Sequence, residues 1–193
     1  SGKTIGANVL VTFPKWNWIF DYYGGPENTD TNKGWKHLVD TTINITPFSK
    51  LSAYVNIDYG QNRNYNNSFA NGSLSVWKAF AGAVRVTPFS KFAFTARGEV
   101  FDDETGYALF GAAGYDGVPF ENQVREVTFT GEYKFMEGLL WRAEYRHDWA
   151  DQPIFTRGRV FCDGICPQED GLGNSKTQNT LTFAVIGYFG PKR

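Results

Sequence analysis

The sequence has few of the residues on which enzyme chemistry usually depends. Only two of its 193 residues are histidines, His37 and His147. No G-x-S-x-G segment is present to build a nucleophile elbow, and no phosphate-binding glycine loop or metal-ligand cluster occurs. We therefore expect a protein that is not an enzyme and that needs no cofactor and no metal.

Cysteine is equally scarce, with only Cys162 and Cys166 in the segment F-C-D-G-I-C-P. Two thiolates without a nearby histidine leave zinc short of ligands, and the spacing is not the C-x-x-C-H of covalent haem attachment. A disulfide between Cys162 and Cys166 is the favoured prediction for an oxidising compartment, and two free thiols are the alternative.

The chain also lacks an excess of charge and a long apolar run. Its net charge of −1 gives no reason to expect a nucleic-acid partner. No window approaches the roughly 20 consecutive apolar residues of a membrane-spanning helix, and the mean hydropathy is −0.39. The strands of a membrane β-barrel nevertheless average out as polar, because only every second side chain faces lipid. Hydropathy alone therefore does not decide between a soluble and a membrane protein.

What the sequence does contain is aromatic residues (17%), 21 glycines and a repeated segment. The pentapeptide TPFSK occurs at residues 46–50 and again at 87–91, and apolar and polar residues alternate on both sides of each copy. Alternation with period two predicts β-strands, so each copy reads as a turn between two of them. Shortened copies at 11–15 and 133–138 complete four hairpins, and one further strand follows. The nine predicted strands cover residues 4–12, 16–24, 35–46, 51–60, 73–86, 91–102, 124–134, 139–149 and 178–189.

The connections between these strands alternate strictly between short turns and long loops. This sorting, with strands near the roughly 9–11 residues that cross a bilayer, predicts an all-β, transmembrane, antiparallel up-and-down β-barrel. Nine strands begin and end in the same direction, whereas bacterial single-chain barrels usually have an even number. We therefore expect residues 1–193 to form a single outer-membrane barrel domain that lacks N-terminal strands of a larger barrel. A soluble lipid-binding barrel, with the two faces inverted, is an alternative.

One face of the predicted strands is polar and carries charges of both signs. In a barrel these side chains would line a wet interior and filter solutes by charge; alternatively they form internal salt bridges that stiffen or plug the barrel. Aromatic residues cluster near the strand ends, as in the interfacial girdles of membrane barrels. The predicted pore-lining residues are Arg97, Glu99, Glu126, Glu132, Lys134, Arg142, Glu144, Arg146 and Asp148.

A rim-site protease is a further hypothesis for this chain. Outer-membrane proteases that resemble omptins place Asp pairs and a His-Asp pair at the outer rim of a barrel, and this chain has Asp102-Asp103 and His147-Asp148 at strand ends. In the alternating pattern of its strand, however, His147 falls on the face that is predicted to contact lipid. This hypothesis ranks below the non-enzymatic ones.

Three segments resemble a known family. The G-P-E after an aromatic strand in residues 20–27, the run W-R-A-E-Y-R-H-D at 141–148 and the ending at 180–190 are similar to bacterial outer-membrane proteins of the β-barrel porin-2, or OmpL-like, family. The resemblance implies a passive channel in the bacterial outer membrane for small hydrophilic solutes or ions. Its partners would be outer-membrane lipid and lipopolysaccharide, with a homo-oligomer as one option. A structural or adhesive barrel that binds through its surface loops is the alternative function.

Overall fold

The computed structural model describes residues 2–67, 71–110, 121–156 and 173–188, and it is dominated by nine β-strands. All nine predicted strands are present, with boundaries that differ from the predictions by at most a few residues. A short helix, α1 (Tyr107–Phe110), was not predicted. The strands are β1 (Ile5–Phe13), β2 (Trp16–Gly25), β3 (Lys36–Phe48), β4 (Leu51–Arg63), β5 (Leu74–Phe89), β6 (Phe92–Asp103), β7 (Asn122–Met136), β8 (Leu139–Ala150) and β9 (Thr177–Gly187).

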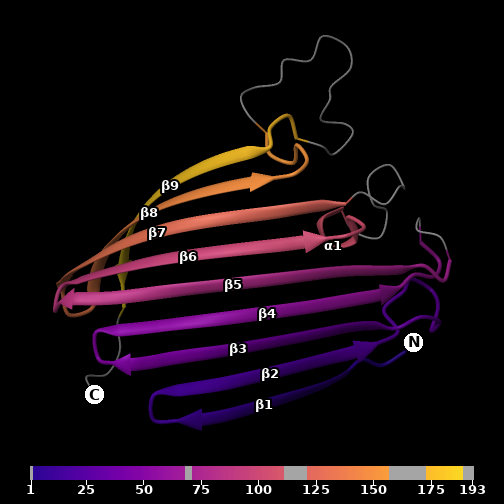
Figure 1. Ribbon diagram of the computed structural model, residues 1–193, viewed down its shortest axis with the longest axis horizontal. Coiled ribbons are helices and arrows are strands. Elements are labelled where there is room, and N and C mark those ends of the chain that lie inside the picture. Colours follow the sequence, from indigo (N-terminus) through magenta and orange to yellow (C-terminus); the bar gives the residue numbers. More distant parts are fainter. Residues whose placement is uncertain (1, 68–70, 111–120, 157–172, 189–193) are drawn as a thin grey trace.

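Each strand pairs in antiparallel fashion with the next one along the chain, and the strand order in the sheet is the order in the sequence. Figure 1 shows one curled sheet, with the four hairpin turns at one end, here called the turn end, and the longer connections at the other, the loop end. The predicted up-and-down topology is confirmed. The sheet is not closed: in the described part of the chain β1 pairs only with β2, and β9 only with β8.

The two TPFSK segments do not form turns over their whole length, and in this respect the prediction was wrong. Both continue the preceding strand as far as Phe48 and Phe89, and only the two residues that follow form the turn. The register shifts at the same place in both copies, just before Phe48 and just before Phe89. Such an irregularity accommodates Pro47 and Pro88, since proline cannot donate a hydrogen bond to a regular ladder. The repeated sequence therefore encodes a repeated bulge at the turn end.

The two faces of the sheet differ in a way opposite to that of a water-soluble protein. Large apolar side chains are exposed on one face, here called the apolar face; Phe183 is 75% exposed. The buried apolar residues of the described chain are only the alanines Ala81, Ala83, Ala93 and Ala150, whereas the largest fully buried side chains are polar. Monomeric soluble proteins rarely expose so extensive an apolar surface. A soluble lipid-binding barrel needs its apolar side chains inside, and the observed burial is the reverse.

Buried asparagines join the loops at the loop end. The Asn28 amide donates hydrogen bonds to the carbonyl oxygens of Lys33 (3.1 Å) and Arg63 (2.8 Å), so it ties the β2–β3 loop to the end of β4. Asn62 and Asn64, both fully buried, continue this network, with a 2.8 Å bond between their side chains. Because these amides hydrogen-bond one another and the backbone, they fix the loops over the end of the sheet.

Helix α1 is attached to the sheet at the loop end by three kinds of contact. The Asp103 carboxylate, at the end of β6, accepts hydrogen bonds from the backbone N–H groups of Ala108 (2.9 Å) and Leu109 (2.8 Å). The Tyr107 ring stacks on Trp77 at 5.5 Å, and the Lys36 ammonium lies 5.3 Å from the centre of the Tyr107 ring. Within the described residues, no helix has the length and apolarity required to cross a membrane.

Candidate functional site

The second face of the sheet, here called the polar face, carries two layers of opposite charge that lie next to each other. Glu126 of β7 is directly opposite Glu99 of β6 and Asp148 of β8. Two residues further along β7, Thr128 is opposite Arg97 and Arg146. Since residues two apart on a strand share a face, three carboxylates adjoin two guanidinium groups on three adjacent strands.

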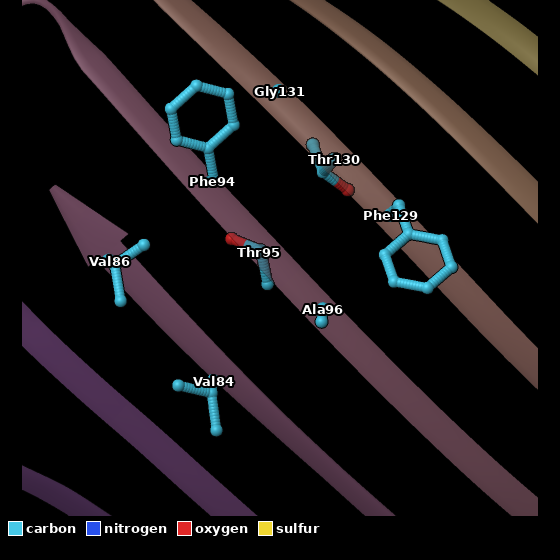
Figure 2. Close-up of a pocket in the computed structure, with 8 residues that line it drawn as sticks. All are labelled: Val84, Val86, Phe94, Thr95, Ala96, Phe129, Thr130 and Gly131. Carbon is cyan, nitrogen blue, oxygen red and sulfur yellow. The ribbon is translucent and has the colours of Figure 1, made fainter. Parts of the chain in front are cut away.

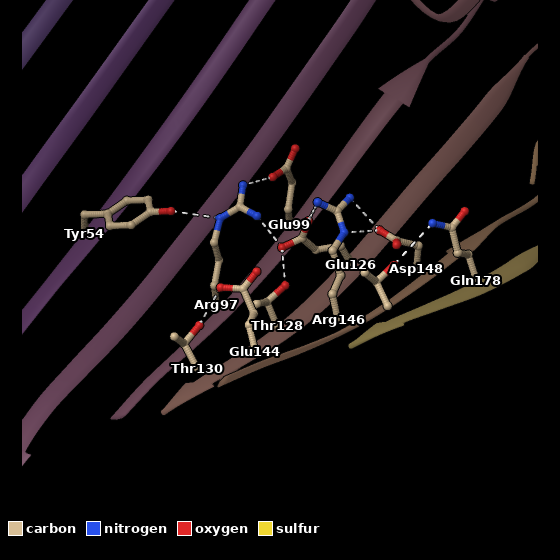
Figure 3. Close-up of polar contacts among 11 residues, drawn as sticks. Tyr54, Arg97, Glu99, Glu126, Thr128, Thr130, Glu144, Arg146, Asp148 and Gln178 are labelled. Atoms are coloured by element: carbon tan, nitrogen blue, oxygen red, sulfur yellow. Dashed lines mark hydrogen bonds and ion pairs between the residues drawn. The ribbon is translucent and has the colours of Figure 1, made fainter. Parts of the chain in front are cut away.

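These groups form one continuous network, which Figure 3 shows. Glu126 forms ion pairs with both arginines: one carboxylate oxygen contacts Arg97, and the other lies 2.9 Å from Arg146 Nη1. Arg97 also pairs with Glu99, and Arg146 pairs with Asp148 at 2.6 Å. Glu126 is therefore the central member of the network, because it alone holds both arginines in place.

Neutral side chains complete the hydrogen bonding of this network. Arg97 Nε donates to the Tyr54 hydroxyl at 3.0 Å, which links the network to β4, and the Thr128 hydroxyl donates to Glu126 at 2.9 Å. Glu144 accepts a 2.9 Å hydrogen bond from Thr130. The charges are thus tied to the sheet by oriented partners rather than left free to move.

A second ion-pair cluster lies closer to the turn end and is centred on Glu132. Its two carboxylate oxygens lie 2.6 Å from Arg85 and 2.6 Å from Arg142. As in the first network, the acid is the more enclosed partner, since the Glu132 side chain is 9% exposed and those of Arg85 and Arg142 are 40% and 41% exposed. The most exposed charged groups of this cluster are therefore the two guanidinium groups, although each is paired.

The nine residues predicted from the sequence to line a pore all lie on the polar face, as their strand register shows. Seven of them take part in the two clusters: Arg97, Glu99, Glu126, Arg146 and Asp148 in the first, and Glu132 and Arg142 in the second. Glu144 bonds Thr130 instead of an arginine, and Lys134 lies apart, at the turn end. Their function as pore lining stays a prediction.

Arg85 and Tyr54 also contact the clusters, but neither belongs to the nine residues predicted from the sequence. Arg85 is two residues from Ala83 and Tyr54 is two residues from Asn56, and both of these lie on the polar face of their strands. The period-two pattern therefore placed Arg85 and Tyr54 on the correct face. What the pattern did not show is their contact with residues of other strands, Glu132 and Arg97.

A row of carboxylates on the polar face was also missed. Asp40 of β3 is directly opposite Asp21 of β2 on one side and Asp58 of β4 on the other. Their polar neighbours are amides: Asn8 donates to Asp21 at 2.7 Å and Asn56 donates to Asp40 at 2.5 Å. No ion pair of these three aspartates occurs among the described residues, so this part of the face, here called the acidic row, is acidic and has no cationic partner.

The geometry does not favour the residue pairs considered for a protease. His147 and Asp148 are neighbours in β8 and point to opposite faces; the imidazole contacts Asn179 at 2.8 Å, while Asp148 holds Arg146. Asp102 and Asp103 are likewise adjacent in one strand. In the part of the chain that the structure describes, no group of three or more His, Cys, Asp or Glu is arranged to hold a metal. Cys162 and Cys166 lie outside the described residues.

The apolar face bears a shallow groove between β5, β6 and β7. It has a volume of about 510 Å³ and is lined by side chains such as Val84, Phe94 and Phe129, with Gly131 at its edge (Figure 2). The lining is almost wholly apolar, which makes this surface suited to contact with hydrocarbon and unsuited to contact with water.

A comparison with protein families gives one match that covers nearly the whole chain. The family model described as "Putative beta-barrel porin-2, OmpL-like" matches residues 1–189. Neither the curated proteins nor the solved structures provide a significant match.

Proposed function

Because the chain belongs to the putative beta-barrel porin-2, OmpL-like family, we propose that it is an outer-membrane porin, a passive water-filled channel for small hydrophilic solutes or ions. Family membership confirms the resemblance seen in the sequence. The observation that carries the proposal is the division of the sheet into an exposed apolar face and an enclosed polar face. This is the division that a membrane barrel with an aqueous interior requires.

The height of the apolar face supports the location in a membrane. On β4, apolar side chains of this face run from Leu51 to Tyr59 and are followed by Gln61 and Arg63. Eight residue steps correspond to about 27 Å along a strand. With a strand tilt of about 40°, this becomes roughly 20 Å along the barrel axis, comparable to the ~25 Å apolar band of outer-membrane barrels. Outer-membrane lipid and lipopolysaccharide would contact this band.

Passage would take place along the polar face. We assign the pore lining to the two ion-pair clusters, which include Arg85, together with Glu144, Lys134 and the acidic row. Fixed charges of both signs would make permeation depend on solute charge as well as on size. For such a pore to close, the edges of β1 and β9 must each gain a neighbouring strand, because an unpaired edge cannot face lipid.

Reconstitution in a planar bilayer tests the proposal directly. The folded protein is expected to produce discrete conductance steps in KCl. A folded, inserted preparation that never gives steps would contradict the channel function. The surface-binding alternative predicts intact insertion without conductance.

The acidic row gives a prediction about ion selectivity. Replacing Asp21, Asp40 and Asp58 together by asparagine is expected to lower the K⁺ over Cl⁻ permeability ratio by roughly fivefold, because loss of the negative charge that the row carries weakens the attraction for nearby cations. The reversal potential in a KCl gradient measures this ratio. Asp30→Asn, in the β2–β3 loop, is the matched control and should leave the ratio unchanged. An unaltered ratio in a conducting triple variant would show that the acidic row does not face the permeating ions.

A further inference from the structure

A pocket with an excess of positive charge lies at the turn end of the polar face. It has a volume of about 720 Å³, and four cationic residues, Lys50, Lys91, Lys134 and Arg85, line it together with Glu132. Two of the lysines are the last residues of the two TPFSK segments. The repeated motif therefore delivers one lysine to this pocket from each of two neighbouring hairpins.

The backbone pairing brings these lysines together. The Lys134 N–H donates to the Lys91 carbonyl at 2.7 Å, one step beyond the pair formed by Phe92 and Tyr133, so Lys91 and Lys134 are cross-strand neighbours. The Thr87 N–H donates to the Lys50 carbonyl at 2.9 Å, and the Lys50 ammonium reaches the Pro88 carbonyl at 3.3 Å. Like charges directly opposite each other across two strands are destabilising.

No carboxylate in the described part of the chain compensates these lysines. The one acidic residue that lines the pocket, Glu132, is already held by Arg85 and Arg142 at 2.6 Å each. No ion pair involves Lys50, Lys91 or Lys134 among the described residues. Each lysine ammonium has three donors, of which Lys50 directs one to the Pro88 carbonyl.

We propose that this pocket binds a phosphate-bearing anion, held by Lys50, Lys91 and Lys134. Phosphate matches the site because it carries more than one negative charge and several acceptor oxygens, which three ammonium groups from different segments can share. Its binding removes the repulsion between Lys91 and Lys134. The phosphate belongs either to a soluble solute or to the headgroup of an anionic lipid at the turn end. The inference concerns binding, so it does not depend on conduction.

Isothermal titration calorimetry with inorganic pyrophosphate at low salt, on detergent-folded protein, tests the site. Each of Lys50→Gln, Lys91→Gln and Lys134→Gln is expected to weaken binding roughly fivefold, and the triple variant to abolish it. Lys15→Gln, in the first hairpin turn and outside the pocket, is the matched control and should bind like the unaltered protein. Circular dichroism shows whether each variant keeps its sheet. A folded triple variant that binds pyrophosphate as tightly as Lys15→Gln would overturn the proposal.

The two sources of phosphate are separated by repeating the titration in nanodiscs. Weaker pyrophosphate binding in phosphatidylglycerol than in phosphatidylcholine nanodiscs assigns the site to a lipid headgroup, because the anionic headgroup then competes for the lysines. Equal binding in both lipids assigns it to a soluble solute. Bilayer conductance is recorded separately, so the absence of channels would reject the porin function while leaving the anion site to the calorimetry.

Discussion

Phe183→Arg is expected to destabilise the folded protein in a bilayer by about 2–4 kcal/mol. Phe183 lies in β9 between Leu181 and Val185 on the apolar face and is 75% exposed, so an arginine there would place a charge within the proposed hydrocarbon band. The measurement is equilibrium unfolding in urea from lipid vesicles, followed by tryptophan fluorescence. In detergent-free buffer the unaltered protein should not stay soluble.

Thr182→Arg is the control for this prediction, since it adds the same side chain one residue earlier in the same strand. Thr182 lies on the polar face, directly opposite Glu144. The new guanidinium would face water and a carboxylate, so the free energy of unfolding should change by no more than about 0.5 kcal/mol. Equal losses in the two variants would contradict the assignment of the faces.

Glu126→Gln is expected to produce the largest effect of any single change on the polar face. Glu126 is 4% exposed and holds Arg97 and Arg146, which would be left facing each other across β7 without their shared anion. Removing one member of a buried ion pair typically costs about 3–5 kcal/mol. Because the arginine side chains are 32% and 46% exposed and water can hydrate them, we expect a loss of about 2 kcal/mol in the free energy of unfolding.

Glu99→Gln is the matched comparison for Glu126→Gln. Glu99 is a carboxylate of the same network, but it is 30% exposed and pairs with Arg97 alone. Its replacement should cost less than about 1 kcal/mol. Both variants remove one negative charge from the polar face, so both should shift ion selectivity toward anions. If the two substitutions were equally destabilising, Glu126 would not be the centre of the network.

The anion site illustrates how function can be carried by residues that look merely solubilising. In the sequence, Lys50 and Lys91 keep a turn hydrated, and nothing in either copy of TPFSK connects it with Lys134. Only the hydrogen bond between the Lys134 N–H and the Lys91 carbonyl reveals that a third lysine joins them. The bulges before Phe48 and Phe89 were hidden in the same way, because proline is common in turns and in bulges alike.

The sequence by itself determined the nine strands, their order and the face on which each charge lies. In a strand successive side chains point to opposite faces, so this information is local and can be read from alternation, as in the run from Arg142 to Asp148. It did not determine which charges meet. Glu126 contacts Arg97 and Arg146, which are 29 and 20 positions away, and a shift of one residue in either register would have moved those arginines to the other face. Contacts across strands depend on register, bulges and the curl of the whole sheet, and these arise only when the strands pack together.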